Sequence, residues 1–184
     1  RHKSFKIFHG VPPEAVRQGI PPRVVNRVVK EGKLMNNDFV KQGYNKAAKN
    51  YAAKRDQFEN NKYLEKLHSF LSPHSRILDI GCGAGKPVDS FFINKGHTLI
   101  GIDMSEKMIE LAKQNVPEAE YKVEDMMELR DGEYKVDAVV SFYAIFHTPR
   151  ETHQELFRKI NSFLTPSGYL LITMGRSEWE GKEQ

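Results

Sequence analysis

Residues 76–88, RILDIGCGAGKPV, decide how the rest of the chain is interpreted. The opening RILDI has the apolar side chains of a buried strand, with one acid, Asp79, among them. Glycines then follow at every second position, as Gly81, Gly83 and Gly85. Because glycine has no Cβ, such a turn lets the backbone approach a ligand closely. The stretch therefore predicts a ligand-binding turn that joins a strand to a helix.

Two common phosphate-binding turns do not fit this stretch. A P-loop reads GxxxxGK followed by Ser or Thr, but here Pro87 follows Lys86, and Ile80 stands where the first glycine belongs. The dinucleotide fingerprint GxGxxG needs its third glycine at position 86, which is lysine. In a GxGxG turn preceded by Asp79, the carboxylate favours a cationic group over a pyrophosphate. A ligand with an ammonium, a sulfonium and a ribose, but no phosphate, fits this pattern.

Two further acidic residues lie at or just after the ends of predicted strands. Asp103 ends a strand twenty residues after Gly83, where a carboxylate can accept hydrogen bonds from both hydroxyls of an adenosine ribose. Asp125 follows the next strand and can accept from an exocyclic amine. Taken alone, Asp103 would equally help to cap a helix that begins near Ser105, and Asp125 would equally be a turn residue.

Strand and helix patterns alternate through most of the chain. Strands are predicted at residues 76–80, 98–103, 119–123, 136–141 and 169–174. Helices are predicted at residues 38–58, 60–71, 86–95, 105–115 and 150–163, the last with a capping box over 148–151. This alternation predicts an α/β fold, a Rossmann-like parallel sheet with helices on both faces.

The composition is that of a globular protein, with 39% hydrophobic and 28% charged residues. No apolar run is long enough to span a bilayer, and the start RHKSFKIF lacks the apolar segment of a secretory signal. We therefore expect a cytoplasmic protein without membrane contact. The single cysteine, Cys82, excludes an internal disulfide framework and a multi-cysteine zinc site, and we predict no metal site.

The beginning of the chain is strongly basic. Residues 1–36 hold eight Lys and Arg against Glu14 and Glu31, a sum of +6 in a chain whose formal net charge is +4. The phrases VPPEAVRQG at 11–19 and IPPRVVNRV at 20–28 each have proline where a helix begins. The sequence thus predicts a basic helical N-terminal extension over 1–36 and a main domain over 37–184.

Four successive phrases carry a family resemblance. They are ILDIGCGAGKPV, GIDMSEKMIELAK, VEDMMEL and VDAVVSFYAIFHTPRETHQELFRKINSFLTPSGYLLIT. In this order and spacing they resemble the motifs of a class I S-adenosylmethionine-dependent methyltransferase of the small-molecule type. YNKAAKNYAAKRDQ resembles the helix that caps the cofactor in those enzymes. The resemblance covers residues 40–180, and it implies S-adenosylmethionine as cofactor and S-adenosylhomocysteine as product.

The resemblance also implies roles for residues at the ends of the first two strands. Gly81 and Gly83 would face the methionine part of the cofactor, with Asp79 near its amino group. Asp103 would bind the ribose, and Met104 would pack on the adenine.

Further roles follow from the later motifs. Asp125 would accept from the adenine amine, with the backbone N–H of Met126 beside it, and Ser141 would lie near the methionine end. From the capping helix, the resemblance assigns Tyr44, Tyr51 and Arg55 to the closure of that end, with Arg55 on the carboxylate. Tyrosines seven residues apart on a helix are equally typical of a core.

Two residues, His147 and Cys82, are candidates for a role in the chemistry of methyl transfer. His147 follows the fourth strand, where substrate-facing groups are expected, and is the candidate catalytic base or substrate ligand. Its alternative is packing or capping beside HTPRE. Cys82 is interpreted as a small filler of the glycine turn and not as a nucleophile.

The acceptor is not specified by the sequence. The fourth strand runs into SFYAIFH, unlike the [DN]PP[YF] box of enzymes that methylate amino groups of DNA bases or glutamine amides. We therefore expect a small-molecule acceptor, with Phe142, Tyr143 and Phe146 either lining its pocket or lying in the core. The alternative is a cofactor-binding domain that docks nucleic acid or a protein partner through residues 1–36.

The chain also departs from the family at its C-terminal end. The family usually continues past the fifth strand with a helix and an antiparallel hairpin, whereas this sequence ends in SEWEGKEQ. The strand at 169–174 would then be an apolar edge, which proteins generally avoid. We expect a further C-terminal piece, residues 4–8 or a second copy in a homodimer to pair with that strand.

Overall fold

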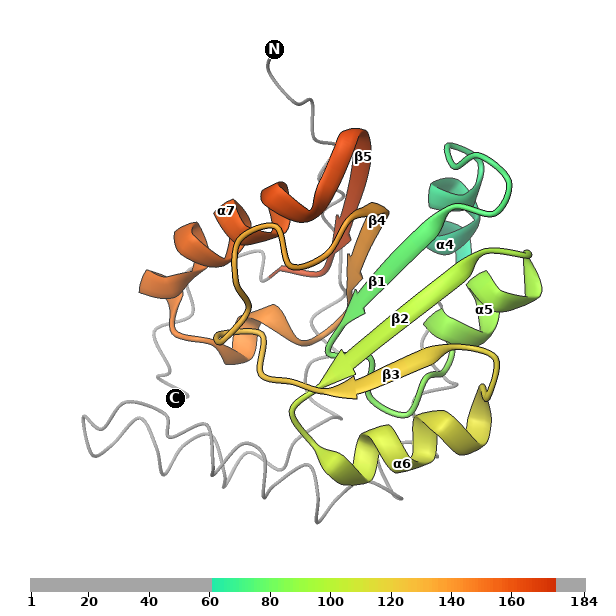
Figure 1. Cartoon of the computed structure of the whole chain (residues 1–184), viewed down its shortest axis with the longest axis horizontal. Helices are drawn as coiled ribbons and strands as arrows, with labels where there is room; N and C mark the ends of the chain where they lie inside the picture. The colour runs from blue at the N-terminus through green and yellow to red at the C-terminus, as the bar shows by residue number, and fades with distance from the viewer. Residues whose placement is uncertain (1–60, 175–184) are drawn as a thin grey trace, which may run out of the picture.

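Five parallel strands form the centre of this computed structural model, which describes residues 61–174 (Figure 1). The strands are β1 (Arg76–Ile80), β2 (Thr98–Asp103), β3 (Glu120–Val123), β4 (Val136–Ser141) and β5 (Leu164–Ile172). The helices are α4 (Asn61–His68), α5 (Val88–Asn94), α6 (Glu106–Asn115) and α7 (His153–Phe163), with short 3-10 turns η1 (Ile145–His147) and η2 (Arg150–Thr152). The strand order is β3-β2-β1-β4-β5, so β1 is central and β3 and β5 are the edges of the described sheet.

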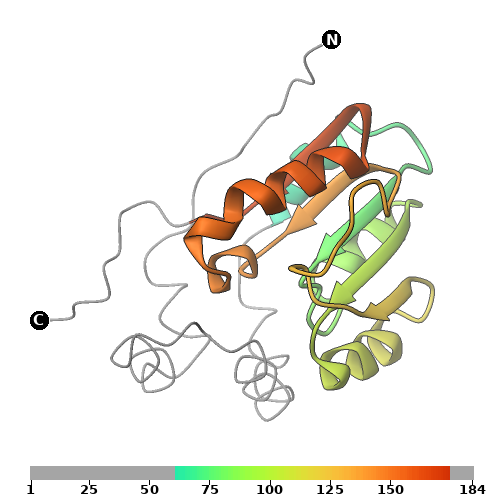
Figure 2. The same ribbon diagram turned by 60° about the vertical axis from the view of Figure 1, so that its left-hand side comes forward.

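Helices cover both faces of this sheet. Neighbouring residues of a strand point to opposite faces, and so Ile77 and Leu78 of β1 enter different apolar clusters. The cluster on one face includes Leu78, Val139, Leu156 and Ile160, and it joins α7 to the sheet. The cluster on the other face includes Leu64, Ile77, Phe92 and Val140, and it joins α4 and α5 to the sheet. Figure 2 shows α7 on the side of the sheet away from α5. The predicted Rossmann-like α/β fold is confirmed.

Three predicted strands have the boundaries found in the structure, namely β1, β2 and β4. The last strand was predicted to begin at Tyr169, but β5 begins at Leu164. The reason is its pairing with β4, in which Val136 lies opposite Leu164 and Ala138 lies opposite Tyr169, with a register shift between them. The strand therefore contains an irregular stretch that an uninterrupted alternation cannot reveal.

The predicted capping box before α7 is wrong. The hydroxyl of Thr148 donates to the carbonyl of Ile145 at 2.7 Å, and neither η2 nor α7 has a side-chain cap at its N-terminus. Residues 150–152 form the separate turn η2, and α7 begins only at His153. The local bond from the threonine hydroxyl to a nearby carbonyl competes with capping, as it often does for Ser and Thr.

Several predictions lie outside the described residues. They concern the extension over 1–36, the helix over 38–58, the boundary between the two predicted domains, and the segment or second copy that would pair with β5. Within residues 61–174, none of the helices has the length and apolar character needed to cross a membrane.

Candidate functional site

The predicted site residues converge at the carboxyl ends of the strands. From β1 the chain proceeds outward to β2 and β3 on one side, and then returns to β4 and β5 on the other. The point where this order reverses, between β1 and β4, is where open parallel sheets form a crevice for ligands. The glycine turn follows β1 at this point, and the loop that contains His147 follows β4 (Figure 1).

The glycine turn is anchored to the neighbouring strand. The N–H groups of Gly81 and Cys82 both donate to the carbonyl of Ile102, at 2.8 and 3.0 Å. Gly81, Gly83 and Gly85 all have positive φ, at 76°, 55° and 79°, which explains why glycine occupies each position. The buried side chain of Cys82 lies in an apolar cluster, in agreement with its interpretation as a filler.

The first two glycines have different surroundings. A Cβ on Gly81 would lie 2.3 Å from the Cβ of Ala144, because the loop after β4 presses against the turn there. A Cβ on Gly83 would meet no atom of residues 61–174 within 4 Å. Gly83 is thus the position where a ligand can approach the backbone.

Asp103 is tied directly to this turn. Its Oδ2 accepts from the N–H of Gly83 at 3.0 Å, and its Oδ1 accepts from the N–H of Ser105 at 2.8 Å. The residue that caps α6 is Ser105 itself, whose hydroxyl oxygen accepts from the N–H of Met108 at 3.2 Å. Asp103 therefore bridges the glycine turn and the start of α6, a position that its capping interpretation does not explain.

The ends of β1 and β4 are joined by Ser141. Its buried hydroxyl donates to the carbonyl of Ile80 at 2.7 Å. Asp79, which is 2% exposed, lies between Gly101 of β2 and Val140 of β4 in the register of the sheet. Asp79 thus places a buried carboxyl group at the centre of the sheet, two residues before the glycine turn begins at Gly81.

Asp125 and Met126 follow β3 in a compact turn. The carboxylate Oδ1 of Asp125 accepts from the N–H of Met127 at 2.9 Å, and its carbonyl accepts from the N–H of Glu128 at 2.9 Å. The alternative interpretation of Asp125 as a turn residue is therefore correct, and it does not exclude a ligand role. Met126 Cε would lie 3.9 Å from a Cβ on Gly81, so this turn approaches the glycine turn. Met104, directly after Asp103, is partly buried.

The loop after β4 contains a strained residue that the sequence did not indicate. Tyr143 has φ of 60°, which is unusual for a bulky side chain, and its N–H donates to Thr173 Oγ1 at 2.6 Å. Strain of this kind concentrates at functional sites. Phe142 and Tyr143 are buried in the cluster that joins α4 and α5 to the sheet, and Phe146 packs partly against it. The core interpretation therefore fits these aromatics.

His147 lies in η1 beside the site. Its ring centroid is 4.4 Å from that of Phe146, and its N–H donates to the carbonyl of Ala144 at 3.0 Å. The side chain is partly buried. This position suits a residue that faces a substrate, and the ring contact with Phe146 also agrees with the packing interpretation.

A buried pair behind the turn was missed by sequence reasoning. The hydroxyl of Tyr121 donates to Asp89 Oδ2 at 2.8 Å, and a Cβ on Gly85 would lie 2.8 Å from that hydroxyl. Burial first, and then the charge and hydrogen bond of Asp89, raise the pKa of Tyr121 far above its usual value. The hydroxyl therefore remains a donor at any physiological pH and supports the back of the glycine turn.

The structure brings most predicted site residues to one edge of the sheet. Tyr44, Tyr51 and Arg55 lie outside the described residues. Within residues 61–174, no group of three or more His, Cys, Asp or Glu side chains is placed to hold a metal ion.

Comparisons with known proteins agree with this geometry. Residues 77–168, half of the chain, match the family described as "Methyltransferase domain". An uncharacterized methyltransferase of Oceanobacillus iheyensis is 29% identical over 108 residues, covering 59% of this chain and 49% of that protein. The phosphoethanolamine N-methyltransferase of Plasmodium falciparum is 32% identical over 108 residues, covering 56% of this chain and 40% of that protein. The chain thus spans half or less of the length of these curated relatives.

A solved structure extends the likeness to the fold. The TehB-like SAM-dependent methyltransferase from Corynebacterium glutamicum has a TM-score of 0.59 at 25% sequence identity. The match covers 74% of this chain and 73% of that chain.

Proposed function

We propose that this chain, which belongs to the class I S-adenosylmethionine-dependent methyltransferase family, binds S-adenosylmethionine and transfers its methyl group to a small-molecule acceptor. The observation that carries the proposal is the contact between Asp103 and Gly83. It places an oriented carboxylate beside Gly83, the one glycine of the turn that has open space next to it within the described residues 61–174.

The residues of the site fit the cofactor. The two N–H donors from Gly83 and Ser105 fix the plane of the Asp103 carboxylate before any ligand arrives, as a group that accepts from ribose hydroxyls requires. Asp79 supplies negative charge near the turn for the ammonium of the methionine part. The turn that begins at Asp125 supplies a carboxylate and the N–H of Met126 for the adenine.

The bound sulfonium supplies an activated methyl carbon, and the transfer is an in-line displacement. The protein therefore has to align the acceptor and, where necessary, remove its proton. His147 is the candidate for the second task, because it lies in the loop after β4, next to Ala144, which contacts the glycine turn. Ser141 would act indirectly, since its hydroxyl fixes the end of β1 to the end of β4.

A small-molecule acceptor is supported by the loop sequence SFYAIFH, which lacks the box of amino-methylating nucleic-acid and glutamine enzymes. One relative, the phosphoethanolamine N-methyltransferase, is named for a small amine. The alternative is a cofactor-binding domain that docks nucleic acid or a protein partner through residues 1–36, and the charge of +6 over those residues favours nucleic acid as that partner. Binding to nucleic acid that weakens steeply with added salt would support that alternative.

Two measurements test the proposal. Titration calorimetry is expected to detect binding of S-adenosylhomocysteine and no binding of NAD or ATP. Labelled S-adenosylmethionine, supplied with a panel of amines, carboxylates and phenols, is expected to give a methylated product. Tight NAD binding without any response to S-adenosylhomocysteine would refute the cofactor assignment, and methylation of nucleic acid alone would refute the acceptor class.

A further inference from the structure

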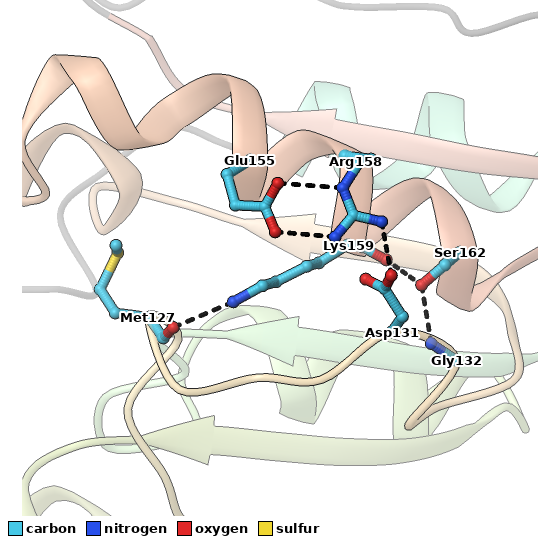
Figure 3. Close-up of polar contacts among 7 residues, drawn as sticks. All are labelled: Met127, Asp131, Gly132, Glu155, Arg158, Lys159 and Ser162. Atoms are coloured by element: carbon cyan, nitrogen blue, oxygen red, sulfur yellow. Dashed lines mark hydrogen bonds and ion pairs between the residues drawn. The ribbon is translucent and has the colours of Figure 1, made fainter.

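We propose that Lys159 of α7 is a positioning residue for the adenine end of the cofactor site. It would act through the turn at Asp125, and the inference rests on the proposed function. Figure 3 shows one side of α7 reaching across to the segment that connects β3 to β4. This segment, residues 124–135, contains the turn that would bind the adenine.

The side of α7 that faces this segment is polar. Glu155, Arg158, Lys159 and Ser162 recur at spacings of three and four residues, which places them along one side of the helix. The neighbouring side carries Leu156, Ile160 and Phe163 into the core cluster beneath the helix. The same cluster contains Leu129 of the connecting segment, 1% exposed, so an apolar contact fixes the middle of the segment under α7.

The far end of the segment is held by exposed contacts. The guanidinium of Arg158 binds the carboxylates of Asp131 and Glu155, and all three side chains are about half exposed. The N–H of Gly132 donates to Ser162 Oγ at 2.8 Å. Exposed ion pairs contribute little to stability and are screened by salt. These contacts lie several residues away from Asp125, and we assign them no role in ligand binding.

Lys159 makes the contact that differs. Its side chain is partly buried, and its Nζ donates to the carbonyl of Met127 at 3.1 Å (Figure 3). That carbonyl and the N–H of Glu128 belong to the same peptide group, and this N–H donates to the carbonyl of Asp125. The ammonium therefore holds the peptide that closes the turn.

The same turn orients the carboxylate of Asp125. The N–H of Met127 donates to Asp125 Oδ1 at 2.9 Å. A shift of the peptide held by Lys159 would change the backbone of Met127 and, with it, the direction of this N–H donor. Lys159 thus fixes the turn from behind, without touching the ligand.

The experiment compares three variants in the full chain. Lys159→Met keeps the length and apolar stem of the side chain and removes the donor, and Lys159→Arg keeps a cationic donor. Arg158→Met is the matched control. It removes a cation from the preceding position of the same helix, and this cation also contacts the connecting segment, at Asp131. Each is titrated with S-adenosylhomocysteine and with S-inosylhomocysteine, in which a carbonyl replaces the adenine amine.

We expect Lys159→Met to weaken S-adenosylhomocysteine binding by about three- to tenfold, the scale of one hydrogen bond only partly transmitted to the ligand. Because the effect passes through Asp125, the preference for S-adenosylhomocysteine over S-inosylhomocysteine should also fall. Lys159→Arg should restore both values, and Arg158→Met should keep the wild-type preference. Without ligand, the amides of residues 127–129 should exchange faster in Lys159→Met than in the control.

Two results separate this inference from the proposed function. If the wild-type protein binds S-adenosylhomocysteine and Lys159→Met keeps its affinity, or loses affinity equally for both ligands, only the inference is overturned. If the wild-type protein binds neither ligand, the proposed function fails and the inference fails with it. Unchanged amide exchange in Lys159→Met would show that the hydrogen bond from Lys159 to the carbonyl of Met127 does not hold the turn, whichever ligand is used.

Discussion

Replacing Asp103 with alanine tests the centre of the proposed site. The carboxylate accepts from the N–H groups of Gly83 and Ser105, so the substitution removes a preorganised acceptor from the edge of the glycine turn. A hydrogen bond to a charged group contributes about 1.5–3 kcal/mol, and part of this is recovered when water replaces the lost acceptor. We therefore expect Asp103→Ala to weaken S-adenosylhomocysteine binding by about 1–3 kcal/mol, which is roughly 5- to 150-fold in Kd.

A control is needed because the substitution also removes two contacts within the fold. Asp137 offers one, since its Oδ2 accepts from the N–H of Arg76 at 2.9 Å and its Oδ1 from the hydroxyl of Thr165 at 3.3 Å. It is also a partly buried strand carboxylate, but it lies near the amino ends of β1 and β4, at the edge opposite the site. Asp137→Ala should lower the unfolding temperature to a similar extent and leave ligand affinity unchanged.

The assay is titration calorimetry with S-adenosylhomocysteine and with its 2′-deoxy analogue, accompanied by thermal unfolding. If Asp103 accepts from the ribose, loss of the 2′-hydroxyl should weaken binding to the wild-type protein and change binding to Asp103→Ala much less. A folded Asp103→Ala protein with wild-type affinity would show that the carboxylate only supports the turn.

Three further predictions concern the surroundings of the turn. Gly83→Ala adds left-handed strain of about 1–2 kcal/mol, but the added Cβ meets no atom of residues 61–174 within 4 Å. It should therefore lower S-adenosylhomocysteine affinity in calorimetry more than it lowers stability, and unchanged affinity would contradict this. Tyr121→Phe removes the hydrogen bond to buried Asp89 and should lower the free energy of unfolding, measured in urea, by about 1.5–3 kcal/mol. An unchanged urea midpoint of unfolding would show that this hydrogen bond does not stabilise the fold. Burial and neighbouring histidines lower the pKa of His97 from 6.5, so protonation of its ring favours the unfolded chain. The unfolding temperature should therefore decrease as the pH falls below about 6.5, and His97→Gln should make this decrease smaller.

Sequence reasoning succeeded where one segment contains the whole signal. The boundaries of β1, β2 and β4 were predicted because each is a short run made largely of apolar residues. A common site for Asp79, Asp103 and Ser141 was implied by the family resemblance, and the three residues lie at or next to the carboxyl ends of adjacent parallel strands. The early start of β5 was missed, because its first residue pairs with Val136 across a register shift that depends on both strands.

The missed contacts join residues that are far apart in the chain. Tyr121 of β3 and Asp89 of α5 are 32 residues apart, and Thr173 after β5 and Tyr143 after β4 are 30 residues apart. An alternating pattern indicates that Tyr121 faces inward, but it cannot indicate that a helix places a carboxylate opposite its hydroxyl. Tertiary packing brings such residues together, and no local sequence motif predicts these pairs.

The loop after β4 shows why the acceptor is harder to infer than the cofactor. The proposed cofactor site is built on Asp103 and the glycine turn, which are joined by a hydrogen bond and lie at the ends of the adjacent strands β2 and β1. The position of His147 depends instead on Tyr143, whose strained backbone is held by Thr173 just after β5. It also depends on Ala144, which presses against Gly81. The proposed acceptor side is therefore built by contacts among the ends of three strands, β1, β4 and β5. Changes beside β5 would then alter acceptor choice while the proposed cofactor residues stay the same.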